Sequence, residues 1–216
     1  MKNVLINGWA TDNGIWKQVS DKINSPEYIC WNDFLQGDFS LPDRCILTGW
    51  SMGGQLAMDL SERPEVAGMV LISSMTNLAS DGKRPGIEPE RCSMISKMLF
   101  RSRRGFLKSF FSECGAPESM IQELLEMTES FSMEDLTAGL AIMFNHVARP
   151  QPWVPTVVIH GTEDRIVPFE VAGYLTSSAL KRARLLTVTG GSHLLPLTEP
   201  DIVAKAVNDL ACSLHS

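Results

Sequence analysis

The chain lacks paired cysteines and long apolar runs. Its five cysteines are odd in number, lie far apart and form no CxxC pair, so we expect reduced thiols and no zinc or other metal site. Cys45 is expected to be a small core residue rather than a catalytic one. No stretch approaches the roughly 20 apolar residues that span a bilayer, and the apolar run at residues 4–6 is too short for a signal peptide. We therefore expect a cytoplasmic protein with no membrane partner.

Positive charge is also scarce. The net charge of -6 and the pI near 5.2 argue against nucleic-acid or anionic-membrane partners, since both require a broad positive surface. No repeat, low-complexity tract or linker interrupts the 216 residues, and an apolar content of 44% is enough for one sizeable core. We expect one folding unit and a monomer.

Continuous apolar runs alternate with helical patterns along most of the chain. Such runs are typical of strands buried on both faces, which indicates a parallel sheet between two helical layers. Strands are predicted at residues 4–6, 28–31, 45–48, 66–72, 155–160 and 184–189, and the stretch 32–43 is expected to be rich in turns. The predicted fold class is α/β.

The strand signal disappears between Ser74 and Pro152. Helical patterns take its place, at residues 90–100, 104–111, 118–129 and 135–147. Long insertions at the strand ends of an open sheet usually cover the binding site. We therefore expect a core formed by residues 1–74 and 153–216, with a helical lid at residues 75–152.

A candidate nucleophile lies at the junction of a predicted strand and helix. Ser51 occupies the centre of Gly49-Trp50-Ser51-Met52-Gly53, directly after an apolar strand and before the helical stretch 55–60. This is a Gly-x-Ser-x-Gly nucleophile elbow, in which a strained turn lifts the Ser hydroxyl above the sheet. A plain strand-to-helix corner would show the same five residues by chance, so the rest of the chain must decide.

A base and an acid follow in later loops. His193 comes after the last predicted strand, and Asp164 comes after the preceding strand, with Glu163 as the rival acid. An acid fixes the tautomer of the histidine that takes the proton of Ser51. The remaining histidines are expected to be structural: His146, His160 and His215.

An oxyanion hole needs two backbone N–H donors. The expected donors are Met52, which follows the nucleophile, and Trp9, in the loop after the first strand. The Trp9 side chain could equally be a core residue, and both interpretations are compatible.

At these residues the chain resembles the α/β-hydrolase superfamily over nearly its whole length. The resemblance rests on residues 7–9, 49–54, 161–168 and 191–193, and on the chain order Ser51, Asp164, His193. Within the superfamily it is most similar to the pimeloyl-acyl carrier protein methyl ester esterases of biotin synthesis. They share Gly-Trp at residues 8–9, Gly-Trp-Ser-x-Gly-Gly at residues 49–54 and the segment 135–140.

Two departures qualify what the resemblance implies. Asn7 stands where the superfamily usually has His, which puts the hydrogen bonds of that loop in question. The elbow also comes early, at residue 51, so the first two strands of the common fold are expected to be missing. We therefore expect a trimmed α/β-hydrolase fold with a six-stranded, all-parallel sheet.

In the esterase family, lid arginines hold the acidic carrier protein. The matching basic stretch, residues 97–108, contains five cations and no acid: Lys97, Arg101, Arg103, Arg104 and Lys108. It would form a local positive patch for the carrier, or simply a solvated helix face. The acids Glu118, Glu123 and Glu126 count against docking, because the family would place further arginines there.

Aromatic residues of the same segment are candidates for an acyl channel. Phe106 and Phe110, together with Trp9, are the preferred substrate-binding residues, ahead of Phe100 and Phe111, although simple packing would give the same spacing.

The predicted function is a serine carboxylesterase that needs no cofactor and works through an acyl-enzyme. The resemblance implies pimeloyl-acyl carrier protein methyl ester as the substrate. The alternatives are another small-ester carboxylesterase or a thioesterase, a lyase with the same triad, and a noncatalytic ligand receptor on the same fold.

Overall fold

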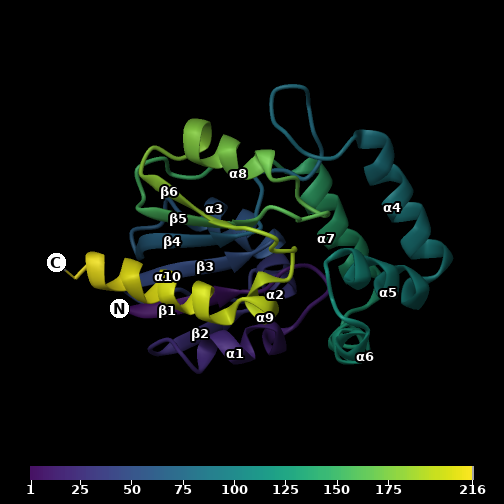
Figure 1. Ribbon diagram of the computed structural model, residues 1–216, viewed down its shortest axis with the longest axis horizontal. Helices are drawn as coiled ribbons and strands as arrows, with labels where there is room; N and C mark the ends of the chain where they lie inside the picture. Colours follow the sequence, from purple (N-terminus) through teal and green to yellow (C-terminus); the bar gives the residue numbers. More distant parts are fainter. Residues whose placement is uncertain (216) are drawn as a thin grey trace.

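A six-stranded, all-parallel sheet forms the centre of the molecule (Figure 1), whose residues 1–215 are described by a computed structural model. The strand order is β2-β1-β3-β4-β5-β6, and every neighbouring pair is parallel. The strands are β1 (Lys2–Ile6), β2 (Pro26–Ile29), β3 (Cys45–Trp50), β4 (Val66–Ile72), β5 (Thr156–Gly161) and β6 (Ala183–Val188). This confirms the predicted fold class and the trimmed sheet.

The burial of the strands follows from their place in the sheet. The inner strands β3 and β5 are buried at every residue, whereas the edge strand β6 keeps most of its side chains accessible. Runs of Ile, Leu and Val fit the inner positions because helices cover both faces of a parallel sheet.

Helices cover both faces. On one face lie η1 (Asn13–Trp16), α1 (Lys17–Ser20), α9 (Leu195–Thr198) and α10 (Pro200–Ser213). On the other lie α2 (Trp31–Gln36), α3 (Met52–Leu60), α8 (Glu170–Tyr174) and the π-helical η2 (Leu175–Ala179). Within residues 1–215, no helix has the length and apolar character needed to cross a membrane.

Helix α2 corrects the expectation that the whole stretch 32–43 is rich in turns, because its first residues are helical. The Asp33 carboxylate accepts a hydrogen bond from the Cys30 backbone N–H at 3.3 Å, which caps the first turn, and Trp31 is buried. Gly37, with φ of 71°, ends the helix in the left-handed region. The helix was missed because it is short and its cap is not a Ser or Thr.

Four further helices separate β4 from β5. They are α4 (Pro89–Arg101), α5 (Arg103–Glu113), α6 (Glu118–Met127) and α7 (Met133–Asn145), and they correspond to the helical patterns predicted for residues 90–147. In Figure 1 they form a group at one end of the sheet, with α4, α5 and α6 outermost. Their division from the core as a lid remains a prediction.

The strand order reverses next to β1. The chain passes from β1 to β2 on one side and then crosses to β3 on the other. In open α/β sheets, ligands bind outside the carboxyl ends of the strands at such a reversal. The loops after β1 and β3 meet there, and they contain Trp9 and Ser51.

Candidate active site

Ser51 occupies a strained turn between β3 and α3. Its φ of 55° lies in the left-handed region, which costs a non-glycine residue of order 1–3 kcal/mol. The Ser51 N–H donates to the Ile72 carbonyl at 2.8 Å, which ties the turn to β4. Gly53 allows the turn, because a Cβ there would collide with the Ile6 carbonyl and lie 2.7 Å from the Asn7 carbonyl oxygen. The sequence therefore places the Ser51 hydroxyl at the carboxyl end of β3, and the turn leaves no room for a side chain at residue 53.

The loop after β1 lies directly against this turn. A Cβ on Gly8 would come within 2.7 Å of Cε3 of Trp50 and 3.2 Å of Cβ of Ser51. Within the described chain, the backbone N–H groups of Trp9 and Met52 donate to no other protein group. Both remain available to a substrate oxygen, and their role as the oxyanion hole stays a prediction.

Asn7 keeps the same loop in place. Its buried side-chain amide donates to the Thr11 carbonyl and, at 3.5 Å, to Sγ of Cys30. The Thr11 hydroxyl in turn donates to the Gly8 carbonyl at 2.9 Å. The loop is thus hydrogen-bonded internally with Asn in place of the usual His.

Asp164 and His193 form a fully buried pair. Oδ2 of Asp164 lies 2.8 Å from Nδ1 of His193, and neither side chain is exposed. Burial alone would raise the pKa of the Asp164 carboxyl, but interaction with His193 and further donors holds that pKa below its ordinary value. Glu163, the rival acid, is exposed and makes no hydrogen bond to His193.

The loop after β5 supplies those further donors. Oδ1 of Asp164 accepts backbone N–H groups from Ile166 and Val167, each at 2.9 Å. His160, at the end of β5, places Nε2 3.4 Å from Oδ2 of Asp164 and 3.0 Å from the Val167 carbonyl. Burial lowers the pKa of His160. The sequence indicated only a structural role for this histidine, although a position four residues before the acid on a strand end was a usable signal.

Ser51 and His193 are brought to one edge of the sheet without a direct hydrogen bond between their side chains. Nε2 of His193 is buried and has no partner among residues 1–215. Trp50, next to the nucleophile, donates its indole N–H to the His193 carbonyl at 2.7 Å, and the two rings are 5.3 Å apart. The hydrogen bond between a catalytic serine and its histidine is often long before substrate binds. The catalytic roles of Ser51, Asp164 and His193 therefore stay predictions, with a geometry that fits them.

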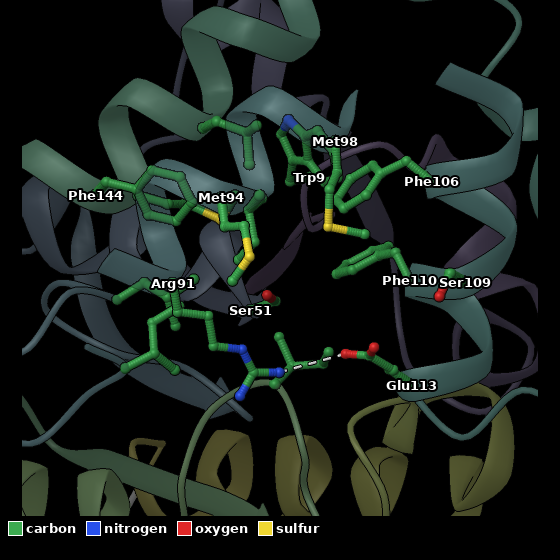
Figure 2. A pocket seen from close by; sticks show the side chains of 16 residues that line it. Trp9, Ser51, Arg91, Met94, Met98, Phe106, Ser109, Phe110, Glu113 and Phe144 are labelled. Carbon is green, nitrogen blue, oxygen red and sulfur yellow. Dashed lines mark hydrogen bonds and ion pairs between the residues drawn. The ribbon is translucent and has the colours of Figure 1, made fainter. Parts of the chain in front are cut away.

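Ser51 opens into an apolar cavity of about 150 Å³ under α4, α5 and α7 (Figure 2). Trp9 packs edge-on against Phe106 and Phe110, with ring centroids 6.3 and 5.4 Å away. These three predicted substrate-binding residues all line the cavity. Phe111 does not, because it is fully buried in the core, and Phe100 lies outside the cavity with 65% of the residue exposed.

Sequence reasoning missed much of the cavity wall. Its other lining side chains are Leu78, Ile87, Arg91, Met94, Ile95, Met98, Ser109, Glu113, Leu140, Met143, Phe144 and Ile166. Most come from α4, α5 and α7, and only the packing of these helices decides which of their faces point inward.

Neighbouring groups engage three of the five cations of the basic stretch. Lys108 pairs with Glu118 at 2.8 Å, Arg104 donates to the Gln122 side chain at 2.9 Å, and Arg103 donates to the Thr128 carbonyl. The side chains of Lys97 and Arg101, one turn apart on α4, have no hydrogen-bond or ion-pair partner within the described chain. Lys108 is therefore the one cation of this stretch that an acid neutralises among the described residues, and the two cations whose side chains are unengaged lie on α4.

The other candidate groups lie apart from this site. Cys45 is buried in β3, and burial raises the pKa of its thiol to about 11. His146 pairs with Asp59 at 2.7 Å, and His215 bonds the Ala211 carbonyl at the chain end. Within residues 1–215, no group of three or more metal-ligating side chains is present.

Comparison with known proteins shows which family the chain belongs to. The model of a family described as "Alpha/beta hydrolase family" matches residues 4–206. The chain belongs to the alpha/beta hydrolase family. The predicted superfamily is thereby confirmed, and most of this hydrolase chain lies inside the match.

Curated relatives and solved structures extend the comparison. A pimeloyl-[acyl-carrier protein] methyl ester esterase from Yersinia pseudotuberculosis is 25% identical to this hydrolase, with 96% of this chain and 92% of the relative covered. A protein of the same name from Pseudoalteromonas atlantica is 22% identical, with 88% and 86% covered. Among solved structures, a bromoperoxidase from Bacillus anthracis superposes with a TM-score of 0.82 at 20% identity, covering 98% of this chain and 92% of that one. The finer resemblance predicted from the sequence is confirmed by the names of the relatives, and the superposition confirms the fold.

Proposed function

We propose that this hydrolase is a serine carboxylesterase that cleaves acyl esters through an acyl-enzyme. The observation that carries the proposal is the buried Asp164–His193 pair beside a Ser51 turn that opens into an apolar cavity. The family match and the esterase names of the relatives agree with this chemistry.

The proposed mechanism follows from the positions of the groups. Asp164 fixes the His193 tautomer, so Nε2 is free to take the Ser51 proton while the serine oxygen attacks the ester carbonyl. The N–H groups of Trp9 and Met52 hold the oxyanion, the alcohol leaves with the proton from His193, and water then releases the acid by the same relay.

The proposed substrate is pimeloyl-acyl carrier protein methyl ester, an intermediate of biotin synthesis. The names of the curated relatives support it. The cavity supports a medium-length acyl chain, because an apolar cavity of about 150 Å³ binds a molecule the size of benzene. Carrier docking is proposed at Lys97 and Arg101, whose charges no neighbouring side chain neutralises. The cytoplasmic location and the monomeric state remain predictions.

The chemistry is tested with Ser51→Ala. Hydrolysis of p-nitrophenyl butyrate should fall by at least about 10⁴-fold, and labelling by a fluorophosphonate should disappear. Wild-type protein that neither turns over esters nor takes the label would instead be a noncatalytic receptor. Product analysis separates hydrolysis from a lyase reaction, and matched oxygen esters and thioesters separate an esterase from a thioesterase.

The substrate is tested by growth. The gene should restore biotin-independent growth to a strain that lacks its pimeloyl ester esterase, whereas the Ser51→Ala gene should not. Failure by well-expressed wild-type protein would overturn the carrier-linked substrate and leave the esterase chemistry standing. A double change of Lys97→Glu and Arg101→Glu should lower kcat/KM for the carrier-linked ester relative to that for p-nitrophenyl butyrate.

A further inference from the structure

One ion pair borders the otherwise apolar cavity. Arg91 and Glu113 are the charged side chains among its lining residues, and Nη2 of Arg91 lies 3.4 Å from Oε2 of Glu113. Figure 2 shows the two side chains pointing toward each other across the cavity, with Ser51 behind them. A substrate in the cavity therefore meets one cation and one anion, besides the hydroxyls of Ser51 and Ser109 and apolar groups.

The pair lies on the side of the cavity next to the His193 loop. Glu113 ends α5, and the following residue, Cys114, accepts a hydrogen bond from the Leu194 N–H at 3.3 Å. In Figure 2 the rings of Trp9 and Phe106 lie on the opposite side of Ser51 from the pair. The cavity thus has an aromatic side and a charged side, with the nucleophile between them.

The ion pair is weak enough to exchange. The Arg91 and Glu113 side chains are 51% and 52% exposed, and one contact at 3.4 Å joins them. Exposed pairs of this kind contribute about 0–1 kcal/mol, whereas a guanidinium that binds a carboxylate or phosphate in a two-pronged arrangement makes a stronger contact. An anionic group that enters the cavity can therefore replace Glu113 as the partner of Arg91.

We propose that Arg91 determines specificity by binding a carboxylate or phosphate group carried on the substrate, which displaces Glu113. The proposal rests on the proposed esterase function and predicts that the enzyme prefers esters that carry an anion over neutral esters of the same acyl chain. Glu113 holds the guanidinium at the cavity until the substrate arrives and competes with the substrate anion for it.

The first test compares three methyl esters that share one acyl chain. Monomethyl pimelate carries a carboxylate, dimethyl pimelate is neutral, and the carrier-linked methyl ester carries a phosphate on its prosthetic arm. In Arg91→Gln, the ratio of kcat/KM for an anionic ester to that for the neutral ester should fall by about tenfold or more, equivalent to about 1.4 kcal/mol. Loss confined to the monomethyl ester identifies a carboxylate, and loss confined to the carrier-linked ester identifies a phosphate.

Two further variants separate recognition from a structural strut. Glu113→Gln removes the group that competes with the substrate anion, so the same ratio should rise. If the ion pair were only structural, Arg91→Gln and Glu113→Gln would change the ratio in the same direction. Arg63→Gln is the matched control, because Arg63 is a half-exposed arginine that pairs with Glu65 at 3.7 Å. This pair lies just before β4, away from the carboxyl ends of the strands where the cavity lies, so the ratio should not change in this variant. An unchanged ratio in Arg91→Gln for both anionic esters overturns the proposal.

A binding measurement makes the test independent of turnover. In a Ser51→Ala background, monomethyl pimelate or the carrier-linked ester should bind more tightly than dimethyl pimelate, and adding Arg91→Gln should abolish that difference. If the wild type cleaves none of the three esters while this preference persists, the proposed function fails and the anion site stands. If the wild type cleaves them and the preference is absent in Ser51→Ala, the anion site fails and the esterase stands.

Discussion

Replacing Asp164 by Asn tests the proposed relay at its buried centre. The amide oxygen of Asn can keep the two backbone hydrogen bonds that Oδ1 now accepts, each at 2.9 Å. Its NH₂ group would then face Nδ1 of His193, where a carboxylate oxygen now lies 2.8 Å away. Two donors cannot share that contact, so the imidazole must move its proton to Nε2, and Nε2 can no longer accept the Ser51 proton.

The expected loss follows from that wrong tautomer. We expect kcat/KM for p-nitrophenyl butyrate to fall by about 10³–10⁴-fold, equivalent to about 4–5.5 kcal/mol of transition-state stabilisation. The assay is steady-state hydrolysis, with circular dichroism to check that Asp164→Asn is folded. Glu163→Gln is the matched control, since Glu163 is exposed and its loss should change the rate less than twofold. A folded Asp164→Asn with more than a tenth of wild-type activity would refute this account, and a large loss in Glu163→Gln would transfer the acid role to that residue.

Three other changes have defined outcomes. Gly53→Ala should lower the free energy of unfolding by about 1–3 kcal/mol in urea titrations, because the new Cβ would lie 2.7 Å from the Asn7 carbonyl oxygen. A Cβ at Gly173 would have no neighbouring atom within 4 Å, so Gly173→Ala should not destabilise the protein. Equal changes in the two variants would contradict the argument from crowding. Because the pKa of Asp164 is held below its ordinary 3.8, its contribution to stability is complete above that pH and is lost as the pH falls toward the folded-state pKa. Between pH 5 and pH 3, the midpoint temperature of thermal denaturation should therefore fall more steeply for wild type than for Asp164→Asn. Parallel curves of midpoint against pH would count against this. Phe110→Ala should reduce the preference for p-nitrophenyl hexanoate over acetate by about tenfold, and a retained preference would place the acyl chain elsewhere.

The candidate residues of the site could be named from the sequence, and their catalytic roles remain predictions. The Gly-x-Ser-x-Gly turn indicated Ser51 because few residues fit a strained strand-to-helix corner, and the structure gives that residue a φ of 55°. Asp164 and His193 were predicted because each lies in the loop after a predicted strand, and the carboxyl ends of parallel strands meet at one edge of the sheet. The structure brings these two within 2.8 Å, although no sequence spacing gives that distance.

The sequence by itself determined the fold class, the sheet of six parallel strands and the candidates for the relay, because strand burial and turn geometry leave local patterns. Only the tertiary structure decided which side chains of α4, α5 and α7 line the cavity. It alone showed that His160 lies near the oxygen of Asp164 that contacts His193, and that Arg91 pairs with Glu113. It also decided that Glu118 of α6 neutralises Lys108, whereas the side chains of Lys97 and Arg101 have no partner among the described residues. Most of these contacts join different helices. The spacing of apolar residues in the sequence indicates which face of a helix is buried, but it does not indicate which neighbour covers that face, because the packing angle and rotation of each helix depend on the other elements of the fold.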